Sequence, residues 1–372
     1  MRRNTSKILW KLMLGLALGT TTNVMAQDAY VPLTLPPAPM NPSTKAPAIL
    51  PSEKEKVVAE DTGGENNEIS REMASAGSSG KGYMLEGIYL LGDYYLVRPR
   101  RQANDFAISS NQRLGVVDGQ TQYMSWNTES GFKVTGGYQF QSGWDLSVGY
   151  FYVHSSGNST AVAPAGGALY ATLTNNTFDD VSSATATGNL DYNFIDIEAG
   201  RTIQPTENLH LRVTAGGRIA WIDQQFSAIY NGGSMAALND FVSSPVHFSG
   251  AGPTIGAEGV WDVNQYFGFY GRGKGGILSG SFKSGLTETN NNGEVTFYNV
   301  TDKYDGLVPV VEVGIGGIIR KDHMHLKIGY ELVNYFNMVD SLDFQSLSFG
   351  KISRRMSDLS LEMLMIEFGL TF

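Results

Sequence analysis

The sequence contains no cysteine among its 372 residues. That absence excludes a disulfide framework, a thiolate metal site and the lipid-modified N-terminal cysteine of a bacterial lipoprotein. Charged residues are also scarce, at 17% of the chain against about 25% in soluble domains. The formal net charge of −9 argues against a nucleic-acid-binding protein, which needs a basic surface.

Long hydrophobic runs are missing as well. No stretch reaches 18 consecutive apolar residues, whereas a membrane-spanning helix needs about 20. If the mature protein crosses a membrane, only a closed β-barrel satisfies its backbone hydrogen bonds there. The chain is instead rich in Gly (44) and in Tyr and Phe (18 each). Glycine permits close bends in a barrel wall, and aromatic residues form girdles at the two membrane interfaces.

The N-terminus has the features of a cleaved secretory signal. Basic residues precede and flank an apolar run from Ile8 to Leu18, which is too short to span a membrane. Val24-Met25-Ala26 then offers the residues that a signal peptidase reads. We therefore predict that residues 1–26 are a signal peptide, cut between Ala26 and Gln27.

Residues 27–80 differ in composition from the rest of the chain. Seven prolines fall between Pro32 and Pro51, followed by a charged stretch and one rich in Gly, Ser and Asn. Such a segment cannot bury enough apolar surface to offset the entropy of ordering it. We expect an extended, disordered periplasmic linker.

From Tyr83 onward, apolar side chains recur at every second position, which is the period of a β-strand. In the clearest segment, 209–221, one face is apolar and the other carries Arg212, Thr214 and Arg218. Ten strands are predicted, at about 83–98, 129–141, 143–154, 188–201, 209–223, 250–262, 266–282, 308–320, 324–336 and 358–372.

The gaps between these strands alternate in length. The short ones are Gln141–Gly143, Thr202–Asn208, Asp262–Gln265 and Lys321–His323. The long ones are at about 99–128, 155–187, 224–249, 283–307 and 337–357. Short periplasmic turns that alternate with long external loops are the topology of outer-membrane barrels. We therefore predict an all-β fold, a transmembrane antiparallel up-and-down barrel of about 10 strands over residues 81–372.

Three details of the strand pattern need the structure. The apolar face changes sides around Phe194–Ile195, where we expect a β-bulge. Asn292-Gly293 is a turn pair, and a separate β-ribbon around it would bring the number of strands to 12. Residues 83–98 are too uniformly apolar for their inward and outward faces to be assigned.

The chain ends with apolar residues at every second position. They are Leu364, Ile366, Phe368, Leu370 and the terminal Phe372. This end resembles the C-terminal strand signal that the bacterial barrel-assembly machinery recognises. We expect that machinery as a partner, reached through Phe372.

Several segments together resemble the Legionella-type pore-forming outer-membrane protein family, the major outer-membrane protein-like barrels. They are 92–101 (GDYYLVRPRR), 143–146 with 150–155, 196–201 (DIEAGR), 217–223 (GRIAWID), 252–259, 269–276, 329–331 and Phe372. The resemblance covers residues 83–372. It implies a barrel in the outer membrane of a Gram-negative bacterium and a porin-like function.

If the apolar faces contact lipid, the opposite faces line a lumen. The charged residues on those faces are Lys133, Asp145, Asp196, Glu198, Arg212, Arg218, Glu258, Arg272, Lys274, Glu312, Lys327 and Glu331. Facing charges of this kind set the field and the effective width of a pore. They would equally fill a narrow barrel with ion pairs, because about eight strands make a barrel that side chains pack and open channels have about 16–18.

We predict a porin-like channel, with no enzymatic activity, for passive diffusion of small hydrophilic solutes or ions. The alternative is a non-conducting barrel that acts in adhesion or surface architecture through its long loops. A lipid hydrolase is a weaker alternative, because His154 and Ser156 lie two residues apart, similar to outer-membrane phospholipases. A hydrolase also needs a polar group that orients the histidine, and Asn158 is the candidate for it, although nothing fixes its position. A strand that runs into a Ser/Gly/Asn-rich loop explains these residues more simply.

No metal or cofactor is expected. His323 and His325 straddle a predicted turn without a third ligand, and a solvated turn is the simpler interpretation. The acidic residues Asp179, Asp180, Asp302 and Asp305 either attract divalent cations or keep the loops soluble. The other expected partners are outer-membrane lipid, lipopolysaccharide and, as a possibility, further copies of the chain.

Overall fold

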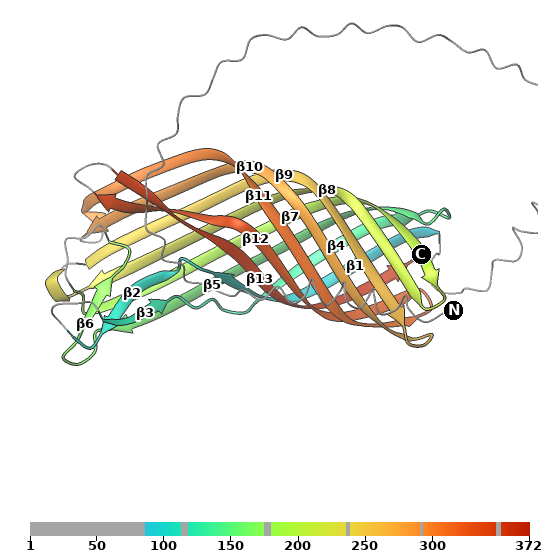
Figure 1. The fold of residues 1–372 in the computed structure, drawn as a ribbon, viewed down its shortest axis with the longest axis horizontal. Coiled ribbons are helices and arrows are strands. Elements are labelled where there is room, and N and C mark those ends of the chain that lie inside the picture. Colours follow the sequence, from blue (N-terminus) through green and yellow to red (C-terminus); the bar gives the residue numbers. More distant parts are fainter. Residues whose placement is uncertain (1–85, 113–117, 175–179, 236–238, 291–292, 347–350) are drawn as a thin grey trace, which may run out of the picture. The chain divides into compact units, whose positions relative to one another are not determined.

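The computed structural model describes residues 86–112, 118–174, 180–235, 239–290, 293–346 and 351–372. Ten strands close into an antiparallel barrel, as predicted, and neighbours along the chain are neighbours in the wall (Figure 1). The barrel strands are β1 (Gly87–Arg101), β4 (Glu129–Gln139), β5 (Trp144–Val162), β7 (Ser183–Thr206), β8 (Leu209–Asn231), β9 (Asn239–Asp262), β10 (Phe267–Asn290), β11 (Val295–Lys321), β12 (Met324–Ser346) and β13 (Lys351–Thr371).

The first and last strands close the ring. β1 pairs with β13 from Tyr89↔Thr371 to Arg101↔Leu359, and the Phe372 amide donates a hydrogen bond to the Ile88 carbonyl at 2.8 Å. The C-terminal strand is therefore part of the wall. Between this level and the short turns the sheet closes on itself without a free edge, but beyond Val310↔Tyr335 the strands β11 and β12 no longer pair with each other.

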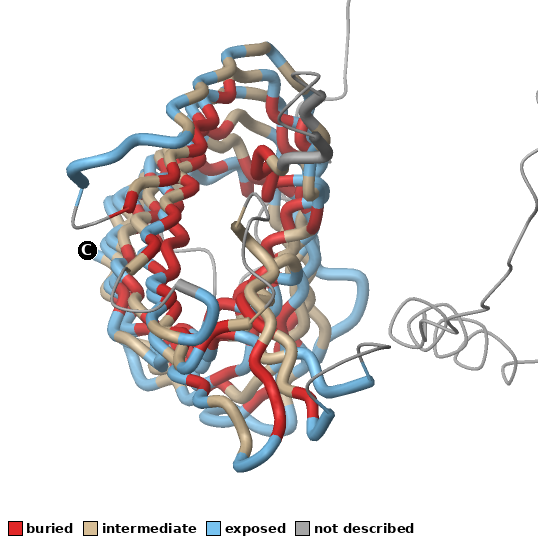
Figure 2. The backbone as a smooth tube through the Cα atoms, turned by 90° about the vertical axis from the view of Figure 1, so that its left-hand side faces the viewer, coloured by how far each residue is buried: buried red, intermediate tan, exposed pale blue. Residues whose placement is uncertain are grey.

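Burial alternates along the wall strands, as the colours of the backbone in Figure 2 show, and successive side chains of a strand point to opposite faces of the wall. On β5, Val148 points outward and is 54% exposed, while its neighbour Ser147 is buried. On β1, the segment that the sequence left undecided, Tyr94 and Leu96 point outward and Asp93 points inward. The outer face near the short turns is therefore a continuous apolar band, as lipid contact requires.

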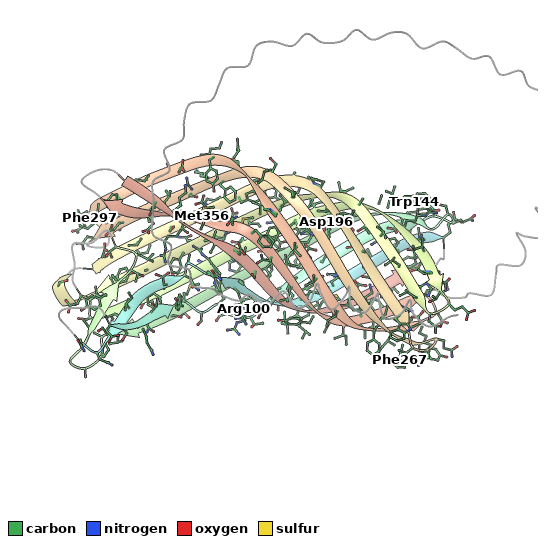
Figure 3. All side chains as sticks on the ribbon, in the orientation of Figure 1. Arg100, Trp144, Asp196, Phe267, Phe297 and Met356 are labelled. Carbon is green, nitrogen blue, oxygen red and sulfur yellow. The ribbon has the colours of Figure 1, made fainter. Side chains whose placement is uncertain are left out.

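Aromatic side chains mark the end of this band at the short turns. Figure 3 shows Trp144 and Phe267 there, and both side chains are exposed. The turn before Trp144 contains Gly143, whose φ of 79° is a conformation that favours glycine. We call this end of the barrel the short-turn end; in outer-membrane barrels it faces the periplasm.

At the opposite end the strands are much longer than predicted. Segments 224–249, 283–307 and 337–357 were expected to be loops, yet most of their described residues continue β8 to β13. The reason is that the apolar pattern changes sides above the lipid-facing band. On β8, Val213 and Ile219 point outward, but further along Ile222 and Phe226 are buried inside. A search for apolar outer faces therefore ends too early.

The same change explains why the predicted β-bulge at Phe194–Ile195 is wrong. The pairing of β7 with β5 and β8 runs without interruption through this point, and the irregularity lies between Ile203 and Thr206. Tyr192 and Phe194 simply point into an apolar part of the lumen, whereas Ile195 and Ile197 point outward. One unbroken strand thus has apolar residues on opposite faces along its length.

Three short strands lie outside the barrel wall at the long-loop end. β2 (Asp105–Ser110) pairs with β3 (Gly119–Tyr123) and with β6 (Ala168–Ala171). The ribbon predicted around Asn292-Gly293 is no addition to the wall, because its two arms are the paired ends of β10 and β11. The wall therefore keeps ten strands.

No helix in the described ranges is long and apolar enough to cross a membrane. The predicted signal peptide (1–26) and linker (27–80) lie outside the described residues, as does Asp179.

Candidate functional site in the barrel lumen

All twelve charged residues predicted to face the lumen lie on the inner face of the wall. Nine of them line one cavity: Lys133, Asp145, Glu198, Arg212, Glu258, Arg272, Lys274, Glu312 and Lys327. Asp196, Arg218 and Glu331 lie directly above it, each bound to members of the same set. Figure 3 shows Asp196 about midway along the barrel. Their role in conduction remains a prediction.

Most of these residues form ion pairs that reach over the lumen. Lys274 on β10 binds Asp196 at 2.6 Å and Glu198 at 2.5 Å, both on β7. β10 and β7 are separated by two strands of the wall, so this contact does not run along the sheet. The other pairs between strands that are not neighbours are Arg212–Asp145, Lys327–Glu258, Arg272–Glu331 and Arg218–Glu312.

Arg218 is the most deeply buried member of this network. Its side chain is 1% exposed and binds the Asp196 carboxylate through two hydrogen bonds of 2.7 and 2.8 Å. It also pairs with Glu312 and donates to the Tyr335 hydroxyl at 3.1 Å. Its guanidinium carbon lies 3.8 Å from the centre of the Phe194 ring. Two carboxylates and an aromatic face therefore compensate the burial of this charge.

An aromatic plug lies directly above Arg218, formed by Tyr95, Phe151, Tyr192, Phe194 and Tyr335. Each of these residues is at most 6% exposed. The rings of Phe151 and Phe194 stack with centres 5.0 Å apart, and the edge of Tyr95 meets Phe151 at 5.3 Å.

A hydrogen bond of 2.5 Å joins the hydroxyls of Tyr192 on β7 and Tyr335 on β12. These strands stand diametrically opposite each other in the ring of ten. This contact between opposite walls fills the middle of the lumen at this level. The aromatic plug therefore narrows the lumen.

Below the plug the lumen contains a cavity of about 330 Å³, which we call the vestibule. Its lining includes Gln139, Asp322 and His323, which lie at or next to the short turns, and reaches up to Glu312 and Lys274. The vestibule therefore opens toward the short-turn end and ends below the aromatic plug. Its wall carries both signs of charge.

Above the plug, at the long-loop end, the inside of the barrel is mainly apolar. We call this part the upper lumen; Ile222, Phe226, Phe248, Phe282 and Leu359 are among the buried residues that fill it. Phe248 and Phe282 pack with ring centres 4.7 Å apart. The inner face therefore changes from charged to apolar along the barrel, a change that the sequence pattern did not predict.

Sequence reasoning missed several lumen residues. Asp93 and Glu367 are buried on the inner faces of β1 and β13 and line the vestibule. The Nε2 atom of His325 lies 2.8 Å from Glu367, so this histidine points inward and is not part of a solvated turn. The sequence could have predicted the inward position of Glu367, because this residue lies between Ile366 and Phe368, which had been assigned to the outer face of the last strand.

The pair considered for a hydrolase lies on the outer face of β5. The Nδ1 atom of His154 is 2.7 Å from the Asp191 carboxylate, and half of the His154 side chain is exposed. Within the described residues, Ser156 makes no side-chain hydrogen bond to His154, which leaves a nucleophile without a base. The absence of enzymatic activity stays a prediction.

The other acidic residues considered for divalent cations do not form a shared site among the described residues. Asp302 pairs with Arg354, and Asp305 is on β11, whose strand continues through the segment expected to be a loop. Across the described ranges, no group of three or more His, Cys, Asp or Glu is arranged to hold a metal ion.

A family model described as the Legionella pneumophila major outer membrane protein precursor matches residues 91–372, which is nearly the whole barrel. A search of curated proteins finds no match.

Several solved structures of bacterial proteins resemble this chain at low sequence identity. The outer membrane protease OmpT from Escherichia coli has 11% identity and a TM-score of 0.43, covering 77% of this chain and 97% of its own. The translocator domain of the autotransporter NalP from Neisseria meningitidis has 11% identity and a TM-score of 0.37, covering 82% and 95%. The P. putida toluene transporter TodX has 10% identity and a TM-score of 0.35, covering 77% and 91%.

Proposed function

Because the chain belongs to the family of the Legionella pneumophila major outer membrane protein and is a β-barrel of the bacterial outer membrane, we propose that it is a porin-like channel for small hydrophilic solutes. The conformation described above is its closed state. Passage requires the aromatic plug and the ion pairs beneath it to separate.

The vestibule is the observation that supports a channel. Charged side chains line a cavity of about 330 Å³ that is open to the periplasmic end. A barrel with a purely structural role gains nothing from such a cavity, because a fully packed interior is more stable than a charged and partly empty one. A transport pathway needs a wet, charged compartment at its mouth.

The closure is local, which makes an open state accessible. The aromatic plug consists of side chains from the wall itself, held by one tyrosine–tyrosine hydrogen bond and the contacts of Arg218. A change of rotamers at Tyr192 and Tyr335 would connect the vestibule with the upper lumen without unfolding a strand.

Conductance in a planar bilayer tests the proposal. We expect rare, brief openings of the wild type and more frequent openings of the double variant Tyr192→Ala/Tyr335→Ala. Tyr330→Ala is a matched control, because Tyr330 lies on β12 too but points outward and is 45% exposed. Folded protein that conducts in neither the wild type nor the double variant would reject the channel.

A second candidate function rests on the length of the strands. β8 to β13 extend well above the lipid-facing band, and the β2–β3–β6 sheet adds a folded surface at that end. A stalk of this kind would present its tip for adhesion or surface architecture without conduction. The same bilayer experiment separates the two, because this candidate predicts no conductance from the plug variant.

Four partners are proposed on sequence grounds. The barrel-assembly machinery would bind the C-terminal strand ending at Phe372, and deletion of Phe372 should then lower the amount of assembled barrel. Outer-leaflet lipopolysaccharide and inner-leaflet lipid would contact the apolar band. Association with further copies is testable by cross-linking in the membrane.

A further inference from the structure

Arg101, the last residue of β1, is buried in the upper lumen, and no carboxylate of the described residues forms an ion pair with it. The residue is 5% exposed, and its Nη2 atom donates to the Ser341 hydroxyl at 2.8 Å. Its guanidinium carbon lies 5.4 Å from the centre of the Phe226 ring. Among the described residues, none accepts a hydrogen bond from its Nε or Nη1 atom, and neither atom is reached by solvent.

The carboxylates on neighbouring elements are engaged by other groups. Asp105 pairs with Arg355, and Asp340 pairs with Arg354 and accepts from the Tyr304 hydroxyl. Burial, and then the positive charge of Arg355, lower the pKa of Arg101 to about 10. Arg101 therefore remains charged at neutral pH while its surroundings disfavour that charge.

A comparison with Arg218 shows what is missing. Both arginines are buried inside the same barrel, but Arg218 has Asp196 and Glu312 within ion-pair distance. The Phe226 ring gives Arg101 only part of that compensation, because an aromatic face supplies neither a counter-charge nor a hydrogen-bond acceptor for Nε and Nη1. A buried charge with unsatisfied donors favours any conformation that brings water to it.

We infer that Arg101 destabilises the packed upper lumen and thereby keeps it close to an opening transition. In the open conformation water would hydrate the Nε and Nη1 groups that have no acceptor in the closed one. The strands near the short turns keep the barrel assembled, so the cost falls on the packing of the upper lumen and on the strand ends that surround it. Only the effect of Arg101 on conductance rests on the proposed channel function; its effect on the stability of the upper lumen does not.

The variant Arg101→Met tests the inference, because methionine has a similar reach and no charge. We expect amide hydrogen exchange in the upper parts of β8 and β12 to slow by about tenfold or more in the folded protein. Arg101→Lys keeps the charge and should exchange as fast as the wild type. Arg100→Met is the matched control: Arg100 is the neighbouring residue, points outward with 59% of its side chain exposed, and pairs with Glu362.

Faster exchange in Arg101→Met than in the wild type would overturn the inference, since it would mean that the contacts of Arg101 stabilise the closed form. Unchanged exchange would overturn it too. The proposed channel is judged separately. If Arg101→Met slows exchange but no variant conducts, the destabilising role stands and the channel function fails. If the wild type conducts and Arg101→Met leaves exchange unchanged, the channel stands and this inference fails.

Discussion

The hydroxyl oxygens of Tyr192 and Tyr335 lie 2.5 Å apart although their strands, β7 and β12, are on opposite sides of the barrel. One hydrogen bond thus joins the two walls at the level where the charged part of the lumen ends. The family, the outer-membrane location and the barrel are established by sequence and fold. A conducting state is our proposal, and it can be tested by removing this contact.

The hydrogen bond and the ring of Tyr335 have separable roles. Tyr335→Phe removes the hydroxyl that contacts Tyr192 and Arg218 but keeps the ring. We expect a loss of about 1–2 kcal/mol in the free energy of unfolding and little added conductance, because the plug stays filled. Tyr335→Ala should lose more stability and conduct. Equal conductance from both variants would show that the ring does not close the lumen.

Arg218→Met should be strongly destabilising. The substitution leaves Asp196 and Glu312 buried with fewer partners, and removal of one member of a buried ion pair costs about 3–5 kcal/mol. Urea unfolding in lipid vesicles measures the change. Arg201→Met is a suitable control, because Arg201 is exposed and lies over the Trp144 ring at the short-turn end. Equal stability of the two variants would contradict the importance assigned to the network.

Charge reversal in the vestibule should alter ion selectivity. Arg272 lines the vestibule and pairs with Glu331, so Arg272→Glu replaces a cation with a second carboxylate. We expect the reversal potential in a salt gradient to shift toward cation preference, measured in the plug variant so that current is sufficient. Arg100→Glu, on the outer face, should leave it unchanged. A wild-type reversal potential in Arg272→Glu would place Arg272 outside the conduction pathway.

The upper lumen should be less stable at neutral than at mildly acidic pH. Asp240 lies at the start of β9, far above the lipid-facing band, and burial raises its pKa to about 6, although contacts with Glu288 and the Phe241 amide lower it in part. The folded form then binds more protons than the unfolded form between about pH 4 and 6, so stability falls as pH rises through this range. Asp240→Asn should reduce that slope in thermal unfolding. An unchanged slope would assign the pH dependence to other groups.

How far the sequence predicted this fold depended on where each strand meets lipid. Within the apolar band, outward residues such as Val148 and Ile315 alternate with polar inward ones, and both strand number and facing were predicted correctly. Above the band the outer face meets water, and the apolar residues, such as Ile222 and Phe226, lie on the inner face. The rule that apolar residues face outward therefore fails there, and it predicted loops where the strands continue.

The candidate site was predictable in its residues but not in its contacts. The alternation placed Arg218 and Asp196 on inner faces, yet nothing in the spacing says that Arg218 reaches Glu312 three strands away. The aromatic plug was missed because Tyr192 and Tyr335 come from segments distant in the chain. Only the closed ring brings them together.

Directional labelling tests the central claim most directly, because the chain has no cysteine of its own. Ser147 lines the vestibule, so Ser147→Cys would place one thiol below the plug. We predict fast reaction with a charged, membrane-impermeant thiol reagent added at the short-turn side. Reaction from the long-loop side should be slow and should accelerate when Tyr192→Ala and Tyr335→Ala are added. Equally fast reaction from both sides without the plug substitutions, or no acceleration with them, would contradict a lumen closed by the aromatic plug.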